Sequence, residues 1–159
     1  MPVACTFRLN SQPKSTLQCF GMGNFEAFSG HGVGRDNPRA VARADIGPLP
    51  PGRYYIVDRQ SGGRLGWLYD YGRKYAYGTD RDQWFALWRA GSGDTTIING
   101  VRRGEFRLHP IGPAGLSDGC ITLTSPQGFS QLARFIRSQG ATWPVPGSGI
   151  KAYGWVDVQ

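Results

Sequence analysis

Hydrophobic and polar residues alternate over many short stretches of this chain, and a period of two predicts β-strands. The 24 glycines and 11 prolines separate these stretches and indicate frequent turns. Asn99-Gly100 lies between two such stretches and is the strongest short signal for a β-hairpin in the chain. We therefore expect short strands at residues 4–9, 15–20, 53–58, 84–88, 95–98, 101–103, 105–109, 120–123 and 151–158.

One helix is marked near the C-terminus. Ser125 is a good N-cap, Pro126 suits the first helical position, and Gly140 is typical of the position that ends a helix. Between them, apolar residues recur at the spacing i, i+3, i+4 and i+7, namely Phe129, Leu132, Ala133 and Ile136. The pattern predicts a single domain, residues 1–159, that is mainly β. We expect a β-sandwich or open barrel of short strands with one C-terminal amphipathic helix.

Residues 21–51 are rich in Gly, Asn, Asp and Pro and show little periodicity. We interpret them as a long ordered excursion, which in a compact domain is usually functional or wraps a site. His31 is flanked by glycines there, which favours an exposed loop position, with a place in the lining of a cleft as the alternative. Further on we expect a turn at 61–63 and an aromatic alternation through Trp67, Tyr69 and Tyr71.

The chain is basic, with a net charge of +7 and a pI near 9.7, which indicates an anionic partner. Nucleic acid, phospholipid headgroups and an anionic cell-wall polymer all qualify, but the Lys and Arg residues form no block, which argues against nucleic acid. No stretch reaches the roughly 20 apolar residues that span a bilayer, so no membrane insertion is expected. The N-terminus lacks the basic start and apolar run of a secretory signal, so we expect synthesis in the cytoplasm without a signal peptide.

The three cysteines are an odd number. Cys5 and Cys19 face each other if the hairpin between them is symmetric about Gln12. Two interpretations stay open for this pair: a disulfide formed in an oxidising compartment, or two small buried hydrophobic side chains. Under either, Cys120 is left over, as a nucleophile requires. Two histidines with scattered cysteines do not supply a zinc site, and no phosphate loop or dinucleotide fingerprint is present, so neither metal nor cofactor is expected.

The strongest candidate chemistry lies at His109 and Cys120, which are separated by the ten residues 110–119. Prolines and glycines make most of this span a loop, so that two short strands can bring the thiol back beside the imidazole. A thiol beside an imidazole is the minimal apparatus for covalent acyl transfer, because the nucleophile needs a base to become a thiolate. The alternation also places His109 on a polar face of its strand, with Arg107 two residues behind it.

The residues before Cys120 fit a supporting role. Gly119 permits an unusual backbone angle and close approach of a substrate. We expect the backbone N–H groups of Gly119 and Cys120 to point at a developing oxyanion. Ser117 and Asp118 are expected to order the loop through hydrogen bonds from side chain to backbone.

The sequence Ser117-Asp-Gly-Cys-Ile-Thr122, with His109 upstream, resembles the active-site signature of L,D-transpeptidases, the YkuD-like cell-wall enzymes. It is more similar to a secreted branch, the L,D-transpeptidase-like effectors of type VI secretion, in which the loop from His to Cys is short. The resemblance extends loosely over nearly the whole chain. Two positions depart from the signature of the housekeeping enzymes: Asp118 replaces a second His, and Thr122 replaces Asn or Arg.

This resemblance implies a cysteine enzyme that acts on the L,D bond of peptidoglycan tetrapeptide stems. Cys120 attacks the carbonyl carbon that is bonded to the terminal D-alanine. His109, oriented through a backbone carbonyl, is the base. The acyl-enzyme then passes to water, to a free D-amino acid or to another stem. Because stems carry several carboxylates, we expect Arg107 to bind one of them, with an ordinary exposed strand residue as the alternative. Thr122 is expected to help determine which features of the substrate are recognised.

Three interpretations of the whole chain follow. The first is an antibacterial effector, a monomer that acts in the target-cell periplasm, with a periplasmic immunity protein and a component of the secretion apparatus as partners. The second is a housekeeping L,D-transpeptidase. The third is a non-catalytic basic module that binds nucleic acid or cell wall, with an inert Cys120.

Overall fold

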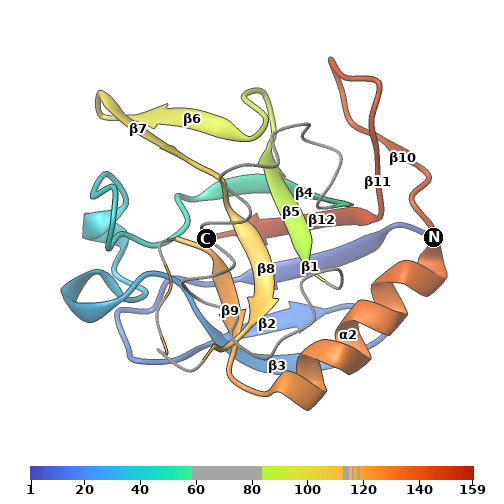
Figure 1. Ribbon diagram of the computed structural model, residues 1–159, viewed down its shortest axis with the longest axis horizontal. Coiled ribbons are helices and arrows are strands. Elements are labelled where there is room, and N and C mark those ends of the chain that lie inside the picture. Colours follow the sequence, from blue (N-terminus) through green and yellow to red (C-terminus); the bar gives the residue numbers. More distant parts are fainter. Residues whose placement is uncertain (59–83, 113–114, 116, 118) are drawn as a thin grey trace.

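A computed structural model describes residues 1–58, 84–112, 115, 117 and 119–159 (Figure 1). The predicted turn at 61–63, the aromatic alternation at 67–71 and the loop residue Asp118 lie outside the described residues.

Eight of the described strands close into a barrel in the order β1-β12-β4-β5-β8-β9-β3-β2 (Figure 1). Pairing is antiparallel except between β1 and β12 and between β8 and β9, which run parallel. The expectation of a mainly β fold with a C-terminal helix is confirmed. The barrel strands are β1 (Val3–Phe7), β2 (Ser15–Cys19), β3 (Gly23–Phe28), β4 (Gly52–Asp58), β5 (Phe85–Arg89), β8 (Arg107–Pro110), β9 (Ile121–Leu123) and β12 (Gly154–Val158).

Two small two-stranded sheets stand outside the barrel, at the top of Figure 1. One is the hairpin of β6 (Thr95–Ile98) and β7 (Val101–Gly104), the other joins β10 (Trp143–Pro144) to β11 (Lys151–Ala152). The β6–β7 turn is the predicted Asn99-Gly100, whose φ values of 49° and 78° match the left-handed turn that suits the twist of a hairpin.

Strand β3 was not predicted, and the interpretation of all of 21–51 as one long excursion between strands is wrong at its start. Ala27 and Phe28 are buried at the end of this strand, whereas its first residues are exposed or half-buried, so the sequence shows no alternation. The strand forms because β2 and β9 supply hydrogen-bonding edges on its two sides. The rest of the segment contains two short 3-10 turns, η1 (Gly32–Gly34) and η2 (Pro38–Ala40).

Most predicted strands differ from the observed ones by one or two residues at an end, and for two of them the structure shows the cause. The strand expected at 105–109 begins at Arg107, because Glu105 has a φ of 60° and donates its N–H to the carbonyl of Asp94 instead of joining the sheet. The strand expected at 151–158 is divided at Tyr153 into β11 and β12.

The helix α2 (Pro126–Gln139) begins and ends where the sequence predicted. Ser125 accepts a hydrogen bond from the N–H of Gly128, and Gly140 follows the last turn with a φ of 78°. The apolar stripe packs into the main core beside the interior side chains of the barrel, which is why the helix forms there; its buried residues are Phe129, Leu132, Ala133 and Ile136. No helix among the described residues is both long and apolar enough to cross a membrane.

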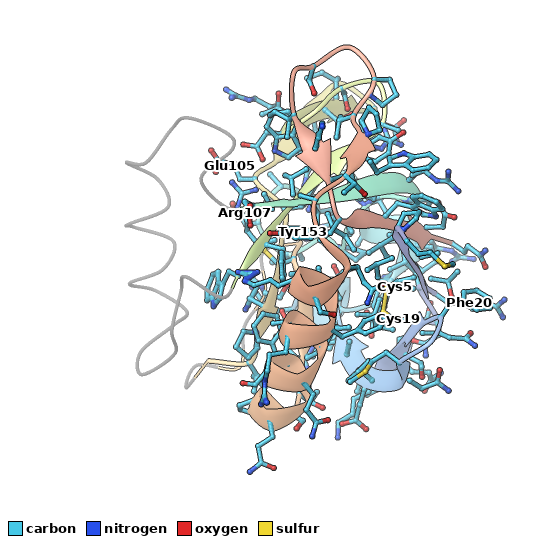
Figure 2. The ribbon with its side chains drawn as sticks, turned by 90° about the vertical axis from the view of Figure 1, so that its right-hand side faces the viewer. Cys5, Cys19, Phe20, Glu105, Arg107 and Tyr153 are labelled. Atoms are coloured by element: carbon cyan, nitrogen blue, oxygen red, sulfur yellow. A yellow bond between two sulfur atoms is a disulfide. The ribbon has the colours of Figure 1, made fainter. Side chains whose placement is uncertain are left out.

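Cys5 and Cys19 form a disulfide that joins β1 to β2 (Figure 2). The two residues are directly opposite in the antiparallel register, as the symmetric hairpin predicted, and their Cα atoms are 4.1 Å apart. Of the two interpretations left open for this pair, the structure has the disulfide. Cys120 is buried and takes no part in this disulfide.

Candidate active site

The strands β8 and β9 hold the two candidate catalytic residues next to each other in the sheet. They pair in parallel, with His109 opposite Thr122 and Leu108 opposite Ile121. Cys120 lies one residue before β9 and two before Thr122, so the two-residue period of a strand gives Cys120 and Thr122 the same side. Since Leu108 and Ile121 both belong to the interior core, His109, Thr122 and Cys120 are assigned to the outer side of the barrel wall.

The imidazole of His109 is held at both ring nitrogens. Nδ1 lies 2.7 Å from the carbonyl oxygen of Pro110, and since a carbonyl only accepts, Nδ1 carries the proton. Nε2 therefore holds the lone pair, and the hydroxyl of Thr122 donates to it across 3.3 Å. A base anchored on a backbone carbonyl, with its basic nitrogen turned toward β9, is the arrangement that general-base chemistry at Cys120 requires.

Burial sets the charge of this histidine. The ring is 0% exposed and stacks on Trp84, with centroids 4.4 Å apart and an angle of 20° between the planes. Burial lowers the pKa of His109 to about 4, against which the hydrogen bond to Pro110 acts in the opposite direction. The imidazole is neutral at pH 7 and able to accept a proton.

The predicted polar face of β8 is buried in the structure, so the alternative of an ordinary exposed strand residue at Arg107 is wrong. Cys120 is 1% exposed and Arg107 is 2% exposed. Arg107, which is labelled in Figure 2, donates from Nη1 to Oδ1 of Asp94 at 2.8 Å and to the carbonyl of Phe106 at 2.7 Å. Its role as a carboxylate clamp stays a prediction, and a substrate there would share the guanidinium with Asp94.

Ser117 ties the loop before Cys120 to the rest of the site. Its hydroxyl donates to the carbonyl of Cys120 at 2.8 Å and accepts from the N–H of Gly30 at 3.3 Å. Its own carbonyl accepts from Nδ1 of His31 at 3.0 Å. The loop that ends at Cys120 is therefore fastened to the segment around His31, which is far away in the sequence.

His31 is half-buried against this loop, so the exposed position favoured by its glycine neighbours is wrong. Sequence reasoning ranked it low because a histidine between glycines has no periodic pattern to place it. Only the fold brings Gly30 and His31 beside Ser117.

The site has no room for a side chain at position 119, which is occupied by glycine. Its φ is 102°, which side chains rarely adopt, and a Cβ there would lie 2.5 Å from Nη2 of Arg103 and 3.1 Å from the ring of Phe106. The predicted unusual backbone angle is present, and the structure adds the close approach of a buried guanidinium.

Arg103 is a supporting residue that the sequence analysis missed. Its guanidinium is buried below Gly119 and donates to three carbonyls of the 41–48 segment: Gly47 at 3.0 Å, Pro48 at 3.3 Å, and Val41. Alternation along β7, with Arg102 exposed, was the available signal that Arg103 turns inward. Arginine in a short hairpin strand gives no other sign of such a role.

No group of three or more His, Cys, Asp or Glu side chains among the described residues is arranged to hold a metal ion. The site brings together a buried thiol just before β9 and a neutral imidazole on β8.

Comparison with models of known protein families identifies the family of this chain. The model of the Tlde1 domain matches residues 23–148, which is most of the chain and includes His109 and Cys120. The chain belongs to the Tlde1 domain family. No curated protein and no solved structure matches it.

Tlde1 domains form a family of type VI secretion effectors of the L,D-transpeptidase type that modify peptidoglycan. The suspected family is thus confirmed. The Tlde1 match begins in β3 and ends after β10, so the Cys5–Cys19 disulfide lies before it.

Proposed function

We propose that this Tlde1 domain is a cysteine-dependent L,D-carboxypeptidase that also exchanges D-amino acids on peptidoglycan tetrapeptide stems. The observation that carries the proposal is the orientation of His109, with Nδ1 anchored on Pro110 and Nε2 facing the strand that begins after Cys120. A family of peptidoglycan-modifying effectors supplies the substrate class.

The proposed reaction uses the residues in two steps. Nε2 of His109 takes the proton of the Cys120 thiol, and the thiolate attacks the carbonyl carbon between the L-centre of the diamino acid and the terminal D-alanine. The N–H groups of Gly119 and Cys120 stabilise the oxyanion. His109 returns its proton to the nitrogen of D-alanine, the C–N bond breaks, and a thioester to Cys120 remains.

The second step regenerates the thiol. Water, or the amine of a free D-amino acid, attacks the thioester and gives its proton to His109, and the C–S bond breaks with the proton passing to Cys120. Water yields a tripeptide stem, and a D-amino acid yields an exchanged tetrapeptide stem. Attack by the amine of another stem would cross-link the two.

The reaction is tested by incubating the purified chain with disaccharide-tetrapeptide muropeptides and identifying the products by mass. Cys120→Ala should abolish release of D-alanine, and His109→Gln should reduce it at least about a hundredfold. Lys151→Gln, an exposed change on β11, serves as the control and should leave the rate unchanged. Unchanged release from Cys120→Ala would remove the proposal and favour a non-catalytic module that binds cell wall.

We further propose that the chain is secreted and acts in the periplasm of a target cell, where an immunity protein protects the producer. The family of secreted type VI effectors supports this. Expression in the cytoplasm of a susceptible bacterium should be harmless, whereas export of the same chain to the periplasm should be toxic and Cys120→Ala should remove the toxicity. Equal toxicity in both compartments would contradict this proposal.

A further inference from the structure

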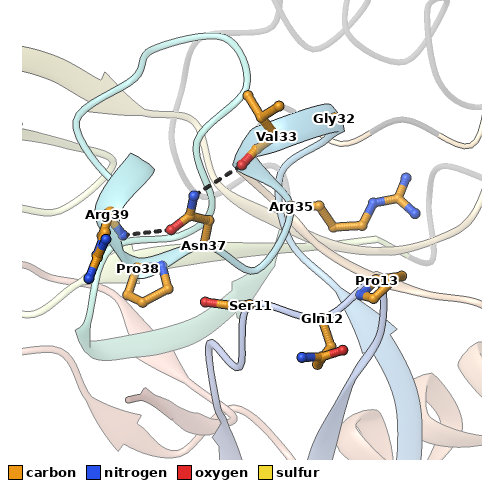
Figure 3. A pocket seen from close by; sticks show the side chains of 9 residues that line it. All are labelled: Ser11, Gln12, Pro13, Gly32, Val33, Arg35, Asn37, Pro38 and Arg39. Atoms are coloured by element: carbon orange, nitrogen blue, oxygen red, sulfur yellow. Dashed lines mark hydrogen bonds between the residues drawn. The ribbon is translucent and has the colours of Figure 1, made fainter.

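A hollow of about 860 Å³ lies beside the segment that holds the Cys120 loop (Figure 3). The turn at residues 11–13 forms one side and the η1–η2 segment forms the other. Two arginines, Arg35 and Arg39, are the charged residues among those that line it.

Neither guanidinium forms an ion pair within the described part of the chain. Arg39 is exposed and its side chain has no hydrogen-bond or ion-pair partner among the described residues. Arg35 donates from Nη2 to the carbonyl of Gly115 at 3.1 Å and lies over the ring of Phe28 at 4.1 Å. No described carboxylate forms an ion pair with it, although its charge attracts the carboxylate of Asp36 and so acts against the effect of burial on the pKa of Asp36. The Nε of Arg35 is buried without a hydrogen-bond partner.

The acidic residue between these arginines contributes little negative charge to the hollow. Asp36 is 0% exposed, and its Oδ1 accepts from the N–H of Ser29 at 2.8 Å on the inner side of the segment. Burial raises the pKa of Asp36 to about 7, so that the carboxyl is partly protonated near neutral pH. The hollow therefore carries a net positive charge.

The remaining polar side chains divide into used and available groups. Asn37 is bonded within the segment, because its Oδ1 accepts from the N–H of Arg39 and its Nδ2 donates to the carbonyl of Val33 (dashed in Figure 3). The amide of Gln12 lines the opposite side. A ligand in this hollow would meet guanidinium and amide donors, which is the chemistry that recognises carboxylates.

The wall of the hollow is bonded directly to the loop of the candidate nucleophile. Arg35 holds the carbonyl of Gly115, and His31, next to the lining residue Gly32, holds the carbonyl of Ser117. The hydroxyl of Ser117 in turn holds the carbonyl of Cys120. A ligand bound to Arg35 thus lies at the edge of the same loop that positions the thiol.

We propose that this hollow is a subsite for an acidic peptide, in which Arg35 and Arg39 bind carboxylates of the peptidoglycan stem whose L,D bond is presented to Cys120. The inference rests on the proposed function for the identity of the peptide. It assigns carboxylate recognition to the exposed Arg39 and the half-buried Arg35, in contrast to Arg107, which is buried and paired with Asp94.

The kinetic test compares Arg39→Gln and Arg35→Lys with Arg134→Gln, an exposed control on α2 that does not line the hollow. Arg39→Gln should raise KM for the free tetrapeptide about tenfold with kcat within about twofold of the wild type. The same peptide with its side-chain carboxylates amidated should show no such difference between wild type and Arg39→Gln. Because the Arg39 side chain is exposed and makes no hydrogen bond or ion pair among the described residues, loss of folding is not expected to obscure the result.

The binding test uses Cys120→Ala, which separates recognition from catalysis. Protein labelled with ¹⁵N is titrated with the tetrapeptide and with its amidated form. NMR chemical shifts are followed at the backbone amides of residues 11, 12, 32–37 and 39. We expect the chemical shifts at these amides to change with the tetrapeptide but not with its amidated form. Adding Arg39→Gln to the Cys120→Ala protein should weaken the affinity for the tetrapeptide about tenfold.

The two proposals fail in different ways. Release of D-alanine with KM and binding unaffected by both arginine variants would overturn the subsite and leave the proposed function standing. Absence of D-alanine release, together with carboxylate-dependent and Arg39-dependent binding, would overturn the proposed function and leave an acidic-peptide site. Shifts confined to other surfaces would also overturn the subsite.

Discussion

The hydroxyl of Thr122 lies 3.3 Å from Nε2 of His109, so β8 and β9 are joined at the candidate site by side chains as well as by backbone pairing. The position that differs from the Asn or Arg of the housekeeping enzymes thus contacts the proposed base directly. Thr122 is fully buried, which makes this contact a fixed part of the site.

Thr122→Val keeps the shape of the side chain and removes the hydroxyl. The neutral ring loses the donor at its lone pair, so the pKa of His109 should rise and the ring should lose part of its orientation. We expect kcat for D-alanine release to fall about tenfold and the acidic limb of the pH profile to move to higher pH. Thr122→Ser, which keeps the hydroxyl, should retain the wild-type profile, and an unaltered profile in Thr122→Val would show that the contact has no catalytic effect.

The stability of the domain should depend on pH through two buried groups that act in opposite directions. His109 has a pKa of about 4 in the folded chain and about 6.5 when unfolded, so its contribution is fully present above pH 6.5 and is lost as the pH falls to 4. Asp36 has a pKa of about 7 in the folded chain and about 3.8 when unfolded, so stability falls as the pH rises from 3.8 to 7. The two slopes largely cancel in the wild type.

A variant that lacks one of these two groups should show the pH dependence of stability that the other group causes. In Asp36→Asn the free energy of unfolding should rise relative to wild type by about 3 kcal/mol between pH 4 and 6.5. In His109→Gln it should fall relative to wild type over the same interval. Urea unfolding at a series of pH values measures both, and curves parallel to the wild type would contradict the assignment of these pKa shifts.

Gly119→Ala should damage both stability and activity. The added Cβ meets Arg103 at 2.5 Å and must also adopt a φ of 102°, so we expect a loss of about 2 kcal/mol of unfolding free energy and at least a hundredfold loss of D-alanine release. Gly149→Ala is the matched control, because no atom lies within 4 Å of the position that its Cβ would take and its backbone is not strained. Equal behaviour of the two variants, measured by thermal unfolding and product release, would contradict the proposed packing of Arg103 against Gly119.

The disulfide should contribute stability without contributing to the chemistry. Cys5 and Cys19 are separated by 14 residues, so the double substitution to Ala should lower the free energy of unfolding by about 3 kcal/mol. In the barrel order β1 lies opposite β8, so D-alanine release below the unfolding temperature should be unchanged. Denaturant unfolding with and without reductant measures the first effect, and a large loss of activity in folded protein would contradict the second.

The elements that the sequence determined are those governed by near neighbours along the chain. The stripe from Phe129 to Ile136 and its caps are sufficient for α2, because a helix repeats every few residues. Asn99-Gly100 is sufficient for the β6–β7 turn, because its left-handed angles are a local preference. The opposition of Cys5 and Cys19 followed from counting residues around one hairpin.

The tertiary structure decided what depends on distant partners. Strand β3 exists because β2 and β9 provide its hydrogen bonds, and Arg107 is buried because Asp94 pairs with it. The sequence identified His109 and Cys120 as candidates, yet the contact of His31 with the Cys120 loop and that of Arg103 with Gly47 arise only when the barrel closes. Such contacts join residues far apart in the chain, so no local period or turn preference encodes them, and the burial that sets the pKa of His109 comes from the same closure.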